Sequence, residues 1–116
     1  MQMSTMTPDV GRKKKKRKKS RVVHIPRYHV ILWDDNDHTY DYVIEMLMKL
    51  FGHSREKAYL MAVEVDTRGK VIVDTTSKER AELKRDQIHA YGADWRIPRC
   101  KGSMSATIEP AENEES

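Results

Sequence analysis

Hydrophobic and polar positions along the chain predict an opening strand followed by two helices. Residues 27–33 are rich in β-branched and aromatic side chains, which is typical of a strand. Apolar residues then recur at helical spacing in two stretches. Each stretch starts after a residue that can cap a helix, Thr39 or Ser54, and ends at a glycine, Gly52 or Gly69.

The second half of the chain predicts a strand, a third helix and a last strand. Residues 71–73 form a short apolar run, and residues 76–79 match a capping box that opens a helix reaching Tyr91 and stopping at Gly92. Residues 104–108 alternate as a strand does. The order β-α-α-β-α-β contains no long parallel crossover. We therefore expect an α+β sandwich, with three helices covering a three-stranded antiparallel sheet.

Composition limits this fold to one modest core. The chain has 116 residues, 38% of them hydrophobic and 34% charged, and its mean hydropathy is −0.80. Residues 1–21 have nothing to bury, so we expect a disordered basic arm there. Residues 22–110 should form the domain, and residues 111–116 an acidic disordered tail.

Charge separates the arm from the domain. Residues 12–21 hold nine of the 22 Lys and Arg, whereas only one of the 18 acidic residues, Asp9, precedes Val22, so the remainder carries about −4. The net charge of +4 therefore describes the arm. Its cations would bind phosphate weakly and without sequence preference, and no aromatic residue interleaves them to stack on bases. Nucleic-acid association through this arm is the alternative function.

The cysteine count and the lengths of the apolar runs indicate the cellular compartment. The single cysteine, Cys100, excludes an internal disulfide, which fits a reducing compartment. No apolar run approaches the roughly 18 residues of a membrane helix, and the N-terminus lacks the apolar core of a signal peptide. We expect a cytoplasmic protein without a membrane partner.

An acidic loop carries the candidate chemistry. Asp34, Asp35 and Asp37 lie between the first strand and the first helix. Carboxylates beside a helix start and an apolar face suit a cation with an apolar body, such as the ammonium and first side chain of a peptide. The alternative is an ordinary solvated loop.

A metal site is a poorer interpretation of the same loop. Residues 35–39 begin like a calcium loop, but Tyr40 stands where the loop needs glycine and Met46 where it needs a bidentate Glu. Starting one residue earlier recovers Glu45 and still lacks the glycine. We expect no metal and no other cofactor.

Catalysis has no support in the sequence. Cys100 has no obvious histidine partner, and His38 with Asp35 or Asp37 is a pair without a nucleophile. Glycine-rich phosphate loops are absent from the sequence. We expect a binding protein and not an enzyme.

Three separated blocks, VILWDD…YDYVIEMLMKLFG, EKAYLMAVEVDTRGKVIV and TTSKERAELK, resemble the ClpS-type adaptor family. The resemblance covers roughly residues 28–108, departs from the family in residues 92–103 and leaves the arm out. It implies a protein that binds N-degron peptides, which have a free α-amino group and a large hydrophobic first residue. It further implies delivery of these substrates to a Clp AAA+ unfoldase.

The resemblance also implies how the ammonium is held. The family uses an Asn-Asp pair and a His, and the matching residues here are Asp34, Asp35 and Asp66. Carboxylates at positions 34 and 66 can still accept from the ammonium, but Asp34 cannot donate as an Asn can. Crowded like charges should raise the pKa of one carboxylate. We therefore expect binding with a larger electrostatic share than in relatives with Asn and His.

Two further sets of residues follow from the resemblance. The matching side-chain pocket is lined by His38, Tyr40, Val43, Ala62, Val65 and Met104. Methionine is usual at positions 40 and 62, so Ala62 should widen the pocket and Tyr40 narrow its mouth. Glu79 and Lys84 on the third helix match the surface that meets the N-terminal domain of a ClpA- or ClpC-class unfoldase. The alternatives are core packing for the apolar residues and helix capping for Glu79.

Overall fold

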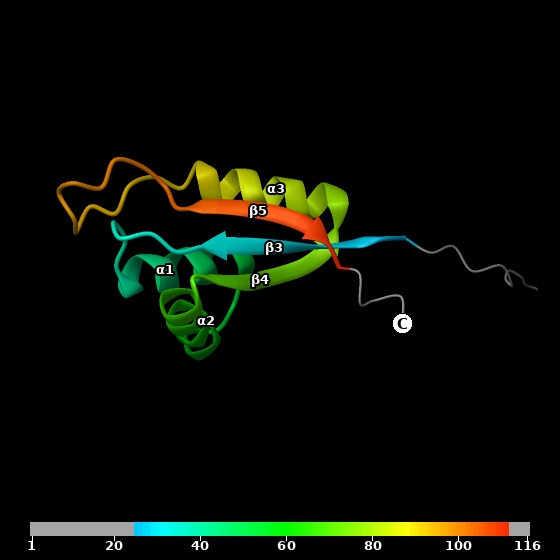
Figure 1. Ribbon diagram of the computed structural model, residues 1–116, viewed down its shortest axis with the longest axis horizontal. Coiled ribbons are helices and arrows are strands. Elements are labelled where there is room, and N and C mark those ends of the chain that lie inside the picture. Colours follow the sequence, from blue (N-terminus) through cyan, green and yellow to red (C-terminus); the bar gives the residue numbers. More distant parts are fainter. Residues whose placement is uncertain (1–24, 112–116) are drawn as a thin grey trace, which may run out of the picture.

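A computed structural model describes residues 25–111, which form three strands and three helices. The predicted arm, residues 1–21, and residues 112–116 lie outside the described part. In chain order the elements are β3 (Arg27–Trp33), α1 (Tyr40–Phe51), α2 (Arg55–Arg68), β4 (Lys70–Ser77), α3 (Lys78–His89) and β5 (Ser105–Pro110) (Figure 1). This order is the predicted one.

The sheet is antiparallel, with β3 between β4 and β5. Its pairing with β5 is regular from Tyr28↔Pro110 to Trp33↔Ser105. Its pairing with β4 shifts between Val30 and Ile31, which marks a bulge in β4. The α+β prediction is confirmed.

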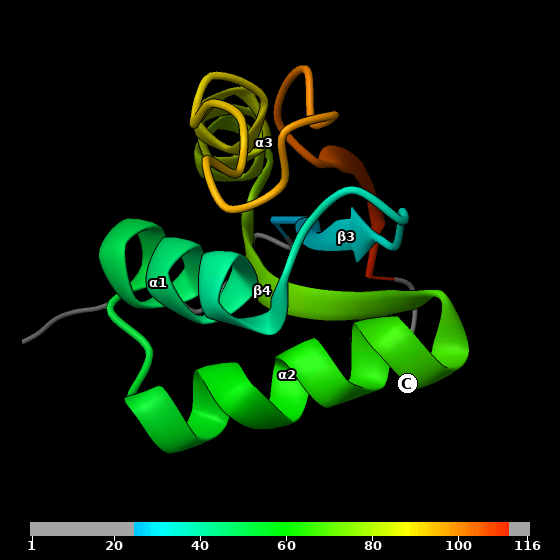
Figure 2. The same ribbon diagram turned by 90° about the vertical axis from the view of Figure 1, so that its left-hand side faces the viewer.

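The core lies between the sheet and the helices. Val30 and Leu32 of β3 are fully buried and pack in one cluster with buried residues of all three helices. Figure 2 looks roughly along β3 and shows α3, α1 and α2 following one another around the sheet. On the outer face, Trp33 donates to the Thr107 hydroxyl across 2.8 Å, which ties β3 to β5.

The predicted helix caps are confirmed for α1 and α2. The side chains of Thr39 and Ser54 accept from the amides of Tyr42 and Lys57, at 3.1 Å each. Gly52 and Gly69 end these helices with φ angles of 70° and 88°. A side chain at such a positive φ would be strained, so glycine is the residue that fits.

The predicted bounds of α3 are wrong at both ends. Ser77, and not Thr76, caps the helix, because its hydroxyl accepts from the Arg80 amide at 3.2 Å. Thr76 stays in β4, which is longer than predicted because polar residues 74–77 continue the pairing with β3. Glu79 is therefore the second helical residue and not the third. The helix ends at His89 instead of continuing to Tyr91.

The last strand starts later than predicted, and the folded part of the chain extends one residue further. β5 begins at Ser105, and Met104 precedes it as a buried core residue. Ala111, predicted to open the tail, is buried, and its amide donates to the Arg27 carbonyl at 2.8 Å. The domain therefore includes residue 111.

Candidate functional site

The acidic loop and the end of α2 lie side by side. The Asp34 amide donates to the Gly69 carbonyl at 2.9 Å, which fixes the end of β3 against the end of α2. Partial burial, followed by the negative charge of Asp66, raises the pKa of Asp34 above its ordinary value; the Asp35 amide lowers it, and the charge of Asp35 raises it. The structure thus brings all three predicted ammonium ligands near enough for the charges of Asp66 and Asp35 to act on Asp34.

Tyr40 covers one of these carboxylates. Its hydroxyl donates to the Asp66 carboxylate at 2.7 Å, and this hydrogen bond is the main reason that the pKa of Tyr40 is raised. Its ring lies 6.1 Å from that of Tyr59 on α2. Both tyrosines line a groove of about 810 Å³ between α1 and α2, with Ile44 and Leu60 among its other walls. Tyr40 therefore belongs both to the acidic cluster and to an apolar groove.

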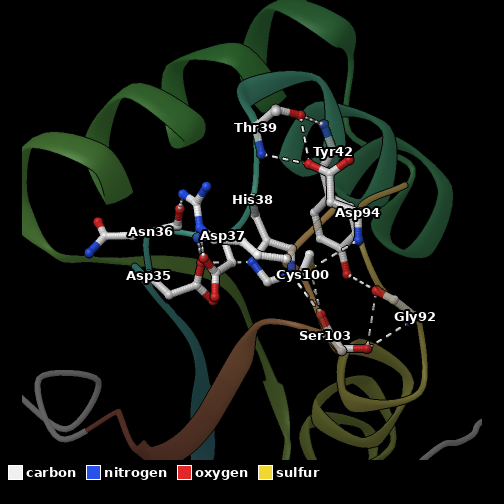
Figure 3. Close-up of polar contacts among 12 residues, drawn as sticks. Asp35, Asn36, Asp37, His38, Thr39, Tyr42, Gly92, Asp94, Cys100 and Ser103 are labelled. Carbon is white, nitrogen blue, oxygen red and sulfur yellow. Dashed lines mark hydrogen bonds and ion pairs between the residues drawn. The ribbon is translucent and has the colours of Figure 1, made fainter. Parts of the chain in front are cut away.

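Asp35 contacts a different partner. Its carboxylate accepts from the Asp37 amide at 2.9 Å and lies 2.7 Å from Nδ1 of His38. The His38 side chain is only 4% exposed. Its Nε2 lies 2.8 Å from the Gly102 carbonyl and 3.3 Å from Sγ of Cys100 (Figure 3). The interpretation of Cys100 as lacking a histidine partner is therefore wrong, because residues 92–103 fold back over the acidic loop.

Asp94 fixes this fold-back and was missed in the sequence. It is 1% exposed, and its carboxylate accepts from the Thr39 amide at 2.7 Å and hydroxyl at 2.8 Å. It also accepts from the Arg96 amide at 3.0 Å and guanidinium at 3.1 Å. Burial alone would raise the pKa of Asp94, but these hydrogen bonds lower it below its ordinary value. A buried carboxylate thus holds the N-terminus of α1, where negative charge is favourable.

We use the name clamp for residues 92–103 together with their contacts to the acidic loop and α1. Two arginines and a tyrosine make further contacts of this kind. Arg96 pairs with Glu45 at 2.7 Å, and Arg99 pairs with Asp37 at 2.8 Å. The Tyr42 hydroxyl donates to the Gly92 carbonyl at 2.5 Å. Burial raises the pKa of Tyr42 to about 12; a hydrogen bond with Ser103 lowers it, and the charge of Cys100 raises it.

The predicted pocket residues lie in three different environments. Val43, Ala62, Val65 and Met104 are at most 4% exposed and belong to the core cluster. His38 is covered by the clamp, whereas Tyr40 is 38% exposed. Tyr40 is therefore the most exposed member of this set.

The two predicted partner-binding residues differ in exposure. Glu79 is exposed and lines a groove of about 310 Å³ with Ile25 and Tyr28. Lys84 is only 9% exposed, and its ammonium donates to the Leu50 carbonyl in the last turn of α1. Of the two predicted residues, Glu79 is accessible at the surface, whereas the ammonium of Lys84 is engaged by the Leu50 carbonyl.

Within residues 25–111, the structure contains no group of three or more His, Cys, Asp or Glu placed to hold a metal ion. In the same residues, no helix is long and apolar enough to span a membrane.

Comparison with known proteins gives one family. The family model described as "ATP-dependent Clp protease adaptor protein ClpS" matches residues 24–96. The chain is 27% identical over 96 residues to the adapter protein ClpS of Desulforapulum autotrophicum, covering 83% of this chain and 92% of that protein. It is 33% identical over 72 residues to ClpS of Hydrogenovibrio crunogenus, covering 62% and 69%.

A solved structure shares the fold. Agrobacterium tumefaciens ClpS2 bound to L-phenylalaninamide superposes with a TM-score of 0.65 at 20% sequence identity, covering 75% of this chain and 99% of that chain.

Proposed function

Because this chain belongs to the ClpS family of ATP-dependent Clp protease adaptor proteins, we propose that it binds N-degron peptides and delivers them to a Clp AAA+ unfoldase. Its ligand is a free α-amino group followed by a large hydrophobic first residue. The observation that carries the proposal is the pairing of Asp34 and Asp66 beside Tyr40. Two like charges held together at the end of the core favour a cation between them.

The ammonium binds between Asp34 and Asp66, with the charge of Asp35 nearby. An α-ammonium has three N–H donors and is costly to dehydrate without acceptors. Two carboxylates supply charge-assisted acceptors, which are stronger than neutral ones. In return, the cation offsets the repulsion from Asp66, which adds to the effect of burial in raising the pKa of Asp34.

Tyr40 controls entry to the side-chain pocket. In the free protein its hydroxyl occupies an oxygen of Asp66. The incoming ammonium replaces this hydrogen bond, and the exposed ring swings aside to admit the first side chain. The other five predicted pocket residues then receive it, with Val43, Ala62, Val65 and Met104 as the apolar wall that is buried before binding. Tyr40→Phe should therefore bind peptide more tightly than the parent protein.

The unfoldase binds at the other end of the sheet. Glu79 lies two residues after Ser77, which pairs with Arg27 at the start of β3. Asp34 directly follows Trp33, at the end of the same strand. Since a strand rises about 3.3 Å per residue, the two ends of β3 lie roughly 20 Å apart. A peptide and an unfoldase N-terminal domain can therefore be held at the same time. Glu79→Ala should weaken capture of that domain, and Asp86→Ala, an exposed change on the same helix, should not.

Peptide titration tests the binding step. A fluorescent peptide with a free N-terminal Phe should bind, and its acetylated form should not, because acetylation removes the cation. Asp34→Ala and Asp66→Ala should each weaken binding, because both the charge and the acceptor oxygens are lost, whereas the remote Asp86→Ala should leave it unchanged. Affinity should fall as salt is raised, since part of it is electrostatic. Equal binding of the free and acetylated peptides would overturn the proposal.

A further inference from the structure

We propose that the groove between α1 and α2 is a second subsite of the peptide site, which receives an apolar or aromatic side chain from the third residue of the bound peptide. Figure 2 shows the two helices that border this groove lying next to each other. The inference rests on the proposed function, because the occupant is the chain that continues from the α-ammonium held by Asp34 and Asp66. It adds a preference beyond the first residue.

The groove has an apolar lining that is open to solvent. Its most buried lining residue is Ile44 of α1, which is 5% exposed. Around it lie Tyr40, Tyr59 and Leu60, which are 38%, 49% and 65% exposed. The volume of about 810 Å³ is within the range of pockets that bind small ligands. Large apolar side chains that gather at the surface around a hollow are typical of a binding site.

Packing of the core does not account for these side chains. Helix α2 contributes Ala58, Ala62 and Val65 as its buried residues. Tyr59 and Leu60 are outside the core cluster and outside the partly buried residues that pack against it. Stability of the fold therefore does not require an aromatic residue or a leucine at these two positions.

The groove begins where the proposed ammonium site ends. The Tyr40 hydroxyl donates to Asp66 at 2.7 Å, and the Tyr40 ring, which lines the groove, lies 6.1 Å from the ring of Tyr59. Tyr59 precedes Asp66 by seven residues, which is nearly two helical turns, so both side chains are on one face of α2. A peptide that starts at Asp66 and runs toward the N-terminus of α2 therefore passes over Tyr59.

The spacing along α2 selects the third residue of the peptide. Seven helical residues span about 10.5 Å. An extended peptide advances about 3.3 Å per residue, and its alternate side chains point to opposite sides. The third side chain therefore starts about 6.6 Å beyond the first and points to the same side, toward the protein. It spans the remaining distance to Tyr59, while the second side chain points to solvent.

The charges around the groove oppose an acidic third residue. Asp41 and Glu56 line the groove together with Arg55, and all three are exposed. They leave one negative charge in excess, on the side of the molecule that also holds Asp66. A carboxylate at the third position would be repelled by these groups and would lose water without gaining a partner. A neutral apolar side chain meets neither cost, so the groove favours it.

Peptides that differ at single positions test this subsite. Each has a free N-terminal Phe, a Gly at the second position and a fluorescent label at its far end. With Leu at the third position the peptide should bind about five- to tenfold more tightly than with Gly, because the groove partly buries the leucine side chain. Asp at the third position should bind more weakly than Gly. Leu at the fourth position should give no advantage, because that side chain points away.

Variants of α2 locate the effect in the groove. Tyr59→Ala should abolish most of the advantage of Leu at the third position and leave the affinity of the Gly peptide within about twofold. Comparing two peptides in one variant cancels any effect that Tyr59 has through Tyr40. Leu60→Ala should reduce the advantage as well. Leu83→Ala is its matched control, because it removes a similarly exposed leucine, 51% exposed, from α3.

The outcomes separate this subsite from the proposed function. If a free N-terminus is required but the third residue has no influence, or if its influence persists in Tyr59→Ala and Leu60→Ala, the subsite is wrong and the function stands. If the two variants leave peptide affinity unchanged but weaken capture of an unfoldase N-terminal domain, or self-association in sedimentation, the groove has a different occupant and the inference is overturned. Equal binding of free and acetylated peptides would refute both.

Discussion

Replacing Asp94 by Asn removes a charge from the most buried carboxylate of the described residues while it changes the side-chain volume very little. The two oxygens of Asp94 accept four hydrogen bonds, two from Thr39 and two from Arg96. Asparagine keeps one oxygen, so two of these bonds are lost and its NH₂ group faces donors. Each hydrogen bond to a charged group contributes about 1.5–3 kcal/mol, so after partial relaxation we expect a loss of about 3 kcal/mol in the free energy of unfolding.

Urea unfolding followed by tryptophan fluorescence measures this loss. In a domain of this size about 3 kcal/mol corresponds to a fall of roughly 12–24 °C in Tm. Asp37→Asn is the matched control, because the same chemical change breaks an exposed ion pair with Arg99 and should cost less than about 1 kcal/mol.

The dependence on pH gives a second check. The pKa of Asp94 is lowered in the folded protein, so below the ordinary value of 3.8 the unfolded chain binds a proton more readily than the native one. The stability that Asp94 contributes is therefore present above this pH and is lost as the pH falls through the folded value. The cost of Asp94→Asn should shrink at pH 3. A cost equal to that of Asp37→Asn, or one that does not change with pH, would refute this account of the clamp.

Three further predictions concern buried groups. The native Tyr42 phenol keeps its proton above pH 10, where the unfolded chain loses it. About 3 kcal/mol of the free energy of unfolding should therefore be lost between pH 10 and 12. Urea unfolding of Tyr42→Phe at these pH values should not show this loss. Lys84→Met removes the donor to the Leu50 carbonyl and should lower the free energy of unfolding by about 1 kcal/mol, whereas Lys57→Met, at an exposed position, should leave it unchanged. Equal effects of the two changes would contradict a stabilising role for the hydrogen bond from Lys84 to Leu50. Ala62→Met inserts atoms at a position that is 1% exposed and should cost about 1–3 kcal/mol by overpacking; an unchanged urea midpoint would indicate free space there.

Local signals account for the parts of the fold that the sequence predicts well. The caps at Thr39 and Ser54 and the stops at Gly52 and Gly69 act within a few residues, so each can be identified from its neighbours alone. Strand pairing that involves polar residues is harder to predict from the sequence. Residues 74–77 look like turn and cap residues, yet their backbone pairs with β3 across nearly fifty positions of sequence.

The candidate site likewise has features that the sequence predicts and features that it does not. Resemblance to a family predicts Asp34 and Asp66, which the structure brings together, but not the hydrogen bond that Tyr40 donates to Asp66. The role of Asp94 has no local signal, because Thr39 lies 55 residues away and the clamp has neither helical nor strand periodicity. The partner of Cys100 was missed for the same reason.

The clamp separates the residues that shape the acidic loop from those that would touch a ligand there. Asp94 and Arg99 hold Thr39 and Asp37 in place without belonging to the Asp34–Asp66 pair. Inherited changes in residues 92–103 can therefore alter which ligands are accepted while every contact residue stays the same. Two adaptors with identical binding residues but different clamps need not share a substrate, so classifying them by binding residues alone would group unlike proteins together.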